Sequence, residues 1–183
     1  MLIIINGASG AGKTFLLGNL HKLKNRKLIA IKKYTTRNIR TFESAINSVD
    51  LIYNCAESDI NALDYHYIYN QHLYGIDKKE ITNEIESGNI PVIIIRSFEI
   101  INKIRQDFPN TKVLFVIGAT GETLERKLDL QGRTCDECAA LKKNHCDIVK
   151  DYLDNIDIID GCIINCLYDE DLLLKQFEYF LAV

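Results

Sequence analysis

A glycine-rich segment close to the N-terminus has the residue types and the spacing of a phosphate-binding loop. It reads Gly-Ala-Ser-Gly-Ala-Gly-Lys-Thr and fits the pattern GxxxxGK[ST] at every position. Glycines let a backbone curl so that successive N–H groups face one anion, which side chains would obstruct. Lys13 is predicted to reach the β- and γ-phosphates of ATP, and the Thr14 hydroxyl is predicted to bind Mg²⁺. The predicted ATP-binding residues are Gly7, Ala8, Ser9, Gly10, Ala11, Gly12, Lys13 and Thr14.

The sequence on both sides of this loop is of the kind that such a loop requires. An apolar run from Leu2 to Ile5 predicts a buried strand before it. After it, Leu16, Leu17, Leu20 and Leu23 recur at helical spacing. A helix that opens directly after the glycines adds its positive N-terminal end to the anion site. This order of strand, turn and helix favours nucleotide binding over a chance match to the pattern.

A second segment carries two arginines that could hold another phosphate. Arg37 and Arg40 lie three positions apart, so on a short loop or turn both guanidinium groups could clamp one anion. Arginine suits this task because its planar fork binds phosphate oxygens through paired hydrogen bonds. The segment therefore predicts a site for a phosphorylated acceptor.

The two segments together resemble the guanylate kinase family of nucleoside monophosphate kinases. The TTRxxRxxE element of that family is present as Thr35-Thr36-Arg37, Arg40 and Glu43, and it is followed by Tyr74-Gly75. Weak similarity extends over nearly the whole chain. The resemblance implies a kinase that transfers the γ-phosphoryl group of ATP, with Mg²⁺, to a nucleoside monophosphate, GMP being the default acceptor.

The resemblance also implies a role for each matching residue. Arg126 and Arg133 would close as a lid over the triphosphate, although a solvated helix surface is the alternative for both. The residues expected to act in catalysis are Lys13, Arg37, Arg126 and Arg133. Those expected to bind the acceptor are Tyr34, Arg37, Arg40, Glu43, Tyr74 and Arg96. No strong general base is required, because positioning and charge neutralisation carry most of phosphoryl transfer.

The chain departs from the family at the positions that recognise the base of the acceptor. Lys33 stands where the family has a serine, and Tyr65 aligns with its guanine-reading glutamate. Ile76 replaces a serine or threonine, and Arg96 replaces an aspartate at a strand end. Guanine offers N–H donors, so the loss of hydrogen-bond acceptors weakens its discrimination. Arg96 is then either a surface residue or a further cation that faces a phosphate-rich acceptor.

Two other functions remain open at this point. The ribose 1,5-bisphosphate kinases resemble guanylate kinases without the base site, and they carry a similar Tyr-x-Thr-Arg element. Tyr34 to Arg37 fits both families, whereas Arg40 and Glu43 favour the guanylate kinases. The other alternative is a guanylate kinase-like module that binds protein partners without catalysis, which the intact phosphate loop opposes.

Short apolar runs alternate with amphipathic ones along the chain, as is typical of an α/β fold with a mostly parallel central sheet. With the phosphate loop, this alternation predicts a P-loop three-layer αβα domain. Predicted strands lie at 2–5, 28–31, 92–95, 112–117 and 162–164. Predicted helices lie at 77–87, 97–107, 120–128 and 169–181, with Gly88 ending the first and Ser97 capping the second. Tyr65, Tyr67 and Tyr69 alternate as on a small strand.

Two polar stretches interrupt this alternation and suggest how the single domain is organised. Residues 1–32 and 77–183 are predicted to form the core, and 33–76 an acceptor-binding insertion. Residues 126–145 are predicted to form a lid. In parallel α/β folds, such excursions usually lie over the carboxyl ends of the strands, where ligands bind.

Composition limits the partners of the chain. It has 183 residues, of which 47% are hydrophobic and 26% charged, and a net charge of -3, so no global field favours nucleic acid or an anionic membrane. Its apolar runs are too short to span a bilayer, and no leader pattern is visible, so we expect a cytoplasmic monomer or homodimer. The partners expected are the small molecules ATP and a phosphorylated acceptor. Cys135, Cys138 and Cys146 lie near His145, but free thiols are favoured over a zinc site, since no second CxxC completes the ligand set.

Overall fold

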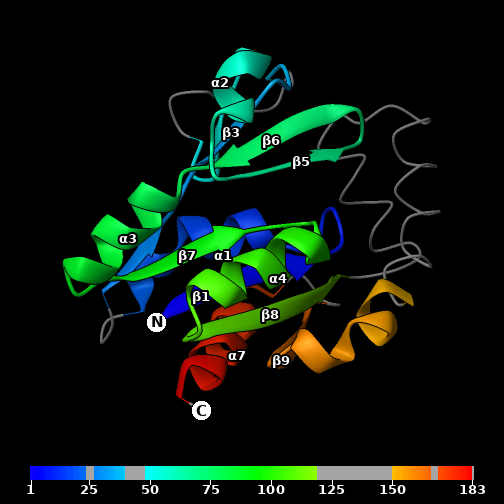
Figure 1. Cartoon of the computed structure of the whole chain (residues 1–183). Helices are drawn as coiled ribbons and strands as arrows, with labels where there is room; N and C mark the ends of the chain where they lie inside the picture. The colour runs from blue at the N-terminus through cyan, green and yellow to red at the C-terminus, as the bar shows by residue number, and fades with distance from the viewer. Residues whose placement is uncertain (24–26, 40–47, 119–149, 166–168, 183) are drawn as a thin grey trace. The chain divides into compact units, whose positions relative to one another are not determined.

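The computed structural model describes residues 1–23, 27–39, 48–118, 150–165 and 169–182. The chain divides into two compact units, which are described separately (Figure 1). Unit 1 comprises Met1–Ile4 and Leu17–Lys112, and unit 2 comprises Ile5–Leu16 and Val113–Val183. Strand β1 (Leu2–Gly7) contributes its first half to unit 1 and its second half to unit 2.

A five-stranded sheet has the strand order β2-β7-β1-β8-β9. The strands other than β1 are β2 (Leu28–Ala30), β7 (Ile90–Ile94), β8 (Thr111–Gly118) and β9 (Gly161–Asn165). β2 pairs with β7 in parallel, and β8 pairs with β9 in parallel. The predicted α/β class with a mostly parallel central sheet is therefore confirmed. The five strands fall where the apolar runs predicted them. β1, β7, β8 and β9 each extend a residue or two beyond the predicted bounds, whereas β2 and β7 end one residue earlier.

Two helices of unit 1 follow the capping signals that the sequence contains. Helix α3 (Lys78–Glu86) is capped by Asp77, whose Oδ1 accepts a hydrogen bond from Lys79 N at 2.8 Å. It ends before Gly88, whose φ of +76° lies in the left-handed region. Helix α4 (Phe98–Asp107) is capped by Ser97, whose Oγ accepts from Ile100 N at 3.3 Å. Both helices were predicted from the sequence.

A second, four-stranded sheet in unit 1 is built from residues 33–76. Its strands lie in the order β4-β3-β6-β5. They are β3 (Lys33–Thr35), β4 (Leu51–Ile52), β5 (Tyr65–Tyr69) and β6 (His72–Ile76), and the short helix α2 (Glu57–Asn61) lies between β4 and β5 in the chain. β3 and β5 both pair with β6 in the antiparallel sense, and β3 pairs with β4 in parallel.

The hairpin that joins β5 and β6 sets which side chains share a face. Asn70 and Gln71 form its two-residue loop and have φ of +48° and +64°, as a type I′ turn requires. The resulting register pairs Tyr67 with Tyr74, and Tyr74 pairs with Thr35 on β3. Side chains alternate along a strand, so these three residues share one face of the sheet.

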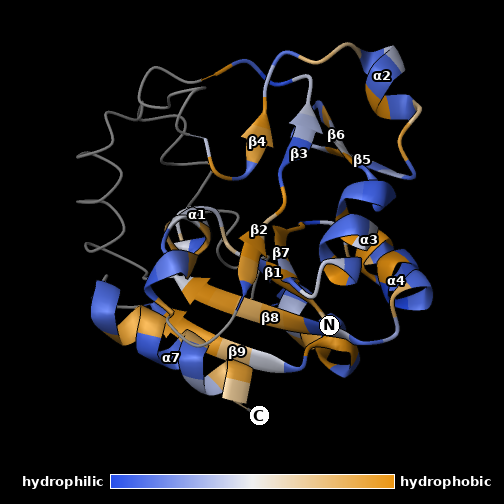
Figure 2. Cartoon of the chain, turned by 90° about the vertical axis from the view of Figure 1, so that its left-hand side faces the viewer, coloured by the Kyte–Doolittle hydropathy of each residue, from blue (hydrophilic) through white to orange (hydrophobic). Residues whose placement is uncertain are grey.

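Unit 2 contains the second half of β1, the phosphate loop, β8 from Val113 onward, β9 and helix α7 (Glu170–Ala182). β8 is hydrophobic along most of its length, whereas α7 carries both kinds of residue (Figure 2). The buried residues of α7 are Leu173, Leu174, Phe177 and Leu181. The close approach of α7 to β9 requires a glycine, because a Cβ at Gly161 would lie 2.6 Å from the Phe180 ring.

Several predictions fall on residues that lie outside those the structure describes. They are the helix at 120–128, the lid at 126–145, Arg40, Glu43, Arg126, Arg133, Cys135, Cys138 and Cys146. Cys55 and Cys162, which the structure does describe, are free thiols. No helix within the described ranges is long and apolar enough to cross a membrane.

Candidate functional site

The phosphate loop in unit 2 connects β1 to helix α1 (Lys13–Gly18) and depends on its glycines. Gly7, Gly10 and Gly12 have φ of +129°, +78° and +97°, which residues with a Cβ rarely adopt. A Cβ at Gly7 would also lie 2.1 Å from the carbonyl oxygen of Val116 on β8. The loop therefore folds as the sequence pattern predicts, with both its curvature and its packing dependent on glycine.

Lys13 places a cation inside this loop. Its side chain is only 8% exposed, and Nζ donates hydrogen bonds to the carbonyl oxygens of Gly7, at 2.8 Å, and of Ala8. The next residue, Thr14, is exposed in the first turn of α1. A buried ammonium group and an exposed hydroxyl, next to each other at the end of a glycine loop, suit a triphosphate and its metal ion.

Asn165, at the end of β9, supports the loop from the other side. Its Nδ2 donates to the carbonyl oxygen of Ala11 at 2.9 Å, and its side chain is 5% exposed. The same Nδ2 lies 2.5 Å from where a Cβ of Gly12 would be. Sequence reasoning did not single out Asn165 as a site residue. The available signal was a polar residue at the carboxyl end of a strand, where ligand sites of α/β folds form.

In unit 1, two threonines fix the start of the arginine segment to β6. Thr35 Oγ1 donates to the carbonyl oxygen of Leu73 at 2.9 Å and accepts from Arg37 N at 3.1 Å. Thr36 Oγ1 accepts from Leu73 N at 3.1 Å. The two hydroxyls thus bind both backbone groups of Leu73, which sets the direction in which the chain leaves β3.

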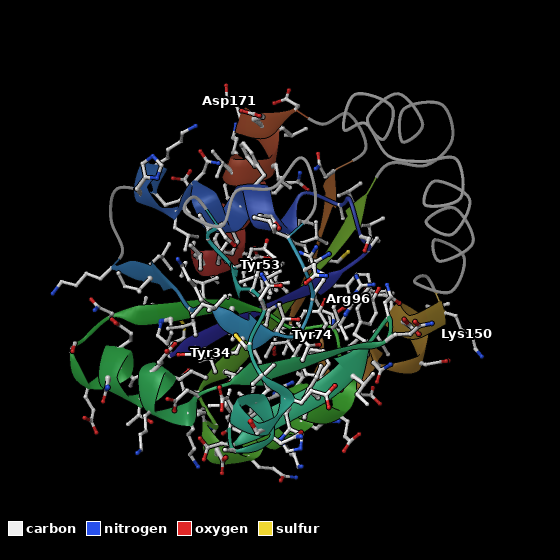
Figure 3. All side chains as sticks on the ribbon, turned by 90° about the horizontal axis from the view of Figure 1, so that it is seen from above. Tyr34, Tyr53, Tyr74, Arg96, Lys150 and Asp171 are labelled. Atoms are coloured by element: carbon white, nitrogen blue, oxygen red, sulfur yellow. The ribbon has the colours of Figure 1, made fainter. Side chains whose placement is uncertain are left out.

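Arg37 is held against an aromatic ring. Its guanidinium carbon lies 5.0 Å from the centroid of the Tyr53 ring, and Nη2 lies 3.5 Å from the Tyr53 hydroxyl. Only 8% of Arg37 is exposed. A tyrosine ring beside a guanidinium group helps to orient its flat fork. Tyr53, labelled in Figure 3, was not predicted from the sequence, since the polar stretch around it shows no periodicity.

Tyr74 and Arg96, both predicted to bind the acceptor, belong to one aromatic cluster. The Tyr74 ring stacks on Tyr67 at 5.5 Å between centroids and meets the edge of Tyr69 at 6.5 Å. Arg96 donates from Nη2 to the Tyr69 hydroxyl at 2.7 Å, and its guanidinium carbon lies 4.8 Å from the Tyr69 ring. The structure therefore brings these two predicted residues together through Tyr69 (Figure 3).

Lys33 joins the same cluster from β3. Its Nζ lies 5.8 Å from the centroid of Tyr74 and donates to the carbonyl oxygen of Ile94 at 2.5 Å. Burial, opposed by Asp50 and assisted by the charges of Arg96 and Arg37, lowers the pKa of Lys33 from 10.5 to about 8. Lys33 is thus a buried cation among other cations.

Tyr34 lies apart from this cluster. Its hydroxyl donates to Glu80 of α3 at 2.8 Å, and this hydrogen bond raises the pKa of Tyr34 to about 12. Because Tyr34 lies between Lys33 and Thr35 on a strand, it points to the opposite face of the sheet from both.

Tyr65, which aligns with the guanine-reading position, lies on the same face of β5 as Tyr67 and Tyr69, but its hydroxyl is engaged by α4. Its hydroxyl donates to Asp107 at 2.5 Å, and Lys78 Nζ forms an ion pair with the same carboxylate at 2.9 Å. Tyr65 is 3% exposed and connects β5 to the end of α4. These contacts make it a structural residue of unit 1.

No protein-family model matches the chain. Curated relatives do match it over most of its length, and those that follow are all guanylate kinases. The guanylate kinase of Pasteurella multocida is 26% identical over 177 residues, which cover 93% of this chain and 83% of the relative. That of Vibrio cholerae is 26% identical and covers 97% and 84%, and that of Buchnera aphidicola (subspecies Baizongia pistaciae) is 29% identical and covers 90% and 80%.

Among solved structures, the chain is similar to the guanylate kinase of Anaplasma phagocytophilum. The TM-score is 0.61 at 16% identity, and the match covers 99% of this chain and 84% of the other. This likeness identifies the fold. The resemblance predicted from the sequence is therefore confirmed, because over most of its length the chain is similar in sequence to guanylate kinases and it shares their fold.

Proposed function

We propose that this chain is an ATP-dependent nucleoside monophosphate kinase of the guanylate kinase type, with GMP and ATP converted to GDP and ADP as its reference reaction. The observation that carries the proposal is the similarity to guanylate kinases over nine tenths of the chain or more, in a chain whose phosphate loop is intact. A module that only binds protein partners has no need of such a loop.

The donor half of the reaction falls to the loop Gly7–Thr14. Its backbone amides bind the triphosphate, and the Lys13 ammonium neutralises charge on the β- and γ-phosphates. Mg²⁺ fits here because the Thr14 hydroxyl is exposed next to Lys13, and the ion would neutralise charge on the phosphate oxygens when bound.

The acceptor half falls to Arg37, which contacts Tyr53, and to Tyr74 of β6. The guanidinium group beside Tyr53 holds the acceptor phosphate by paired hydrogen bonds, and one oxygen of this phosphate attacks the γ-phosphorus of ATP. That oxygen forms the new bond as the bond between the γ-phosphorus and the β-phosphate oxygen breaks, and ADP leaves with the electron pair. We assign Arg126 and Arg133 to stabilising charge on the group in transfer, and Arg40 and Glu43 to the acceptor side.

The test is an ADP-release assay with Mg·ATP and a panel of acceptors: GMP, dGMP, AMP, UMP, CMP and ribose 1,5-bisphosphate. We expect turnover with at least one nucleoside monophosphate and none with the sugar bisphosphate. Lys13→Ala should abolish turnover while circular dichroism shows a folded chain, and Lys27→Ala, an exposed lysine outside the loop, should not. Absence of ADP release with every acceptor would reject the proposed function.

A further inference from the structure

Strand β5 presents three tyrosines on one face, and all three contact the segment that contains α4. They are Tyr65, Tyr67 and Tyr69, which alternate along the strand. The Tyr65 hydroxyl donates to Asp107 at the end of α4. Burial raises the pKa of Tyr67, and a hydrogen bond with the backbone of Arg96 partly opposes this rise. Tyr69 accepts from the Arg96 side chain, so β5 packs against α4 and is bound near both ends of that helix.

The two ends of β5 differ in their distance from the covalent connections of the four-stranded sheet. The sheet joins the rest of unit 1 through residues 31–32, before β3, and through Asp77, after β6. Because β3 and β6 are antiparallel neighbours, both connections lie at the same end of the sheet. Tyr65 pairs with the last residue of β6 at that end, whereas Tyr69 pairs with His72 beside the hairpin loop. Tyr69 is therefore the tyrosine of β5 that lies farthest from the connections.

A sheet that is joined to the chain at one end tilts most at the other end. Tyr65 and Tyr69 lie four positions apart on β5, which corresponds to about 13 Å along a strand. The contacts of Tyr65 with Asp107 and of Lys33 with the Ile94 carbonyl oxygen lie near the connections and oppose a tilt less. The bond between Arg96 and Tyr69 opposes it most, because it acts beside the hairpin loop.

Tyr69 also fixes the ring of Tyr74. The Tyr74 ring meets the edge of Tyr69 at 6.5 Å between centroids, and it stacks on Tyr67 at 5.5 Å. Tyr74 is 9% exposed, so its ring is confined between these two neighbours. Contacts from Arg96 to Tyr69 and from Tyr69 to Tyr74 thus join the segment after β7 to the ring that we assign to the acceptor (Figure 3).

Arg96 makes two contacts with the same residue. Its Nη2 donates to the Tyr69 hydroxyl at 2.7 Å, and its guanidinium carbon lies 4.8 Å from the centroid of that ring. Both residues are half-buried, which strengthens a hydrogen bond to a charged group. Arg96 can therefore affect the acceptor through Tyr69 without touching it.

We propose that Arg96 and Tyr69 are positioning residues for the acceptor. Their contact holds the loop end of the β5–β6 hairpin against the segment after β7 and thereby fixes Tyr74. The inference rests on the proposed function, and it gives a role to the arginine that stands in place of the family's aspartate at this strand end. Arg96 acts through Tyr69, and Tyr69 acts through Tyr74.

A double-mutant cycle tests whether Arg96 acts through Tyr69. Tyr69→Phe removes the hydroxyl and keeps the ring, and Arg96→Met removes the donors and keeps an apolar stem. The probe is the nucleoside monophosphate with the highest kcat/KM in the panel above. Each variant should raise its KM about three- to tenfold, with kcat and KM for ATP within about twofold. The double variant should match Arg96→Met alone, because both substitutions remove the same contact.

Thr111→Val is the matched control. Thr111 Oγ1 donates to the carbonyl oxygen of Phe108 at 2.5 Å, and the residue is 4% exposed. The variant thus loses a buried hydroxyl hydrogen bond in the same unit, at the start of β8. It should lower stability and leave both KM values unchanged, so a loss of stability alone would not produce a selective rise in KM for the acceptor.

Hydrogen exchange gives a second readout that needs no turnover. In Tyr69→Phe and in Arg96→Met, the amides of residues 66–74 should exchange about threefold faster than in the parent, or more, because the hairpin opens more often. The amides of β7 should keep their rates. In Thr111→Val, the amides of residues 66–74 should exchange as in the parent.

The inference and the proposed function fail in different ways. Additive effects of the two substitutions on KM for the acceptor would show that Arg96 binds the acceptor directly, and would overturn the inference alone. An unchanged KM for the acceptor, equal rises in both KM values, or unchanged exchange of the hairpin amides would do the same. Absence of turnover by the parent with every nucleoside monophosphate would reject the proposed function, and the inference with it.

Discussion

Asn165 Nδ2 donates a hydrogen bond at 2.9 Å to the carbonyl oxygen of Ala11, 154 positions earlier in the chain. This bond connects the end of β9 to the middle of the phosphate loop. Both groups are buried, so the bond is protected from competition by water. The conformation of the loop thus depends on a strand at the other end of the sequence.

We predict that Asn165→Asp weakens ATP binding. A carboxylate cannot donate to the Ala11 carbonyl oxygen and repels it, so the loss should be about 1–3 kcal/mol, a rise of roughly 5- to 150-fold in KM for ATP. KM for the acceptor should change little. Asn155→Asp is a matched control, because Asn155 Nδ2 donates to Asp151 O at 2.9 Å on the exposed surface. Equal effects of the two substitutions would contradict the role of Asn165.

Substitution of Arg37 should separate the two substrates. Arg37→Lys keeps the charge but loses the flat fork and its stacking on Tyr53, so we expect KM for the acceptor to rise by about one to two orders of magnitude. KM for ATP should stay within about twofold. Tyr53→Leu should give a smaller rise in the same parameter, since the fork remains but its orientation is less fixed. Steady-state kinetics with each substrate varied in turn measures both, and a parallel rise in the two KM values would place Arg37 outside the acceptor site.

The lowered pKa of Lys33 predicts how stability depends on pH. Its pKa is about 8 in the folded chain against 10.5 in the unfolded one, so the unfolded chain binds more protons between these values. The destabilisation is complete below about pH 8 and disappears as pH rises to 10.5. Lys33→Met should therefore be more stable than the parent by roughly 1–3 kcal/mol at pH 7, with the difference shrinking toward zero above pH 10.

Urea denaturation of both proteins from pH 6 to 10.5 measures this difference. The parent and variant share every other titrating group, so their difference reports Lys33 and the groups coupled to it. A variant that is less stable at pH 7, or a difference that does not vary with pH, would show that Lys33 is not buried as a charged group.

The contacts of Gln176 on α7 indicate how the edge of the five-stranded sheet avoids association with other chains. Its Oε1 accepts from Ile164 N at 3.0 Å and its Nε2 donates to Ile164 O at 2.9 Å, so the side chain occupies both backbone groups of a residue on the edge strand β9. Ile164 itself is 51% exposed. Edge strands with open backbone groups and apolar side chains associate with other chains.

We therefore expect Gln176→Ala to self-associate at concentrations where the parent does not, and to lose about 1–2 kcal/mol of stability. Light scattering during size-exclusion chromatography detects the association. Glu178→Ala, an exposed change on the same helix, is the control. A Gln176→Ala chain that elutes as the parent does would show that β9 is protected by something else.

Local signals in the sequence were enough for the five-stranded sheet, for several of its helices and for the conformation of the phosphate loop. Capping residues, glycine positions and apolar runs predicted α3, α4 and the five parallel-sheet strands, because these depend on neighbours a few positions away. The alternation of Tyr65, Tyr67 and Tyr69 predicted β5 for the same reason. The phosphate loop was predicted residue by residue, since its conformation is fixed by its own glycines.

Contacts between distant segments could not be predicted in this way. Tyr53 and Asn165 act through partners that lie 16 and 154 positions away, and their immediate sequence does not show which residues they contact. Tyr34 shows the same limit for a residue that the motif did mark. A shift of one position along β3 decides whether a side chain lies on the face of Tyr74 or contacts Glu80. The register between strands, rather than the motif, decides which residues share the face of the sheet that carries Tyr74.

Strand β1 has a consequence for anyone who wishes to divide this protein. Its first residues belong to one unit and its last to the other, so the chain enters unit 1, passes into unit 2, returns and leaves again. No single cut yields two continuous fragments that each keep a complete set of strands. If either half were expressed alone, isoleucines that are buried in the whole chain would be exposed to water. A fragment that folds would have to be assembled from two separate pieces of chain.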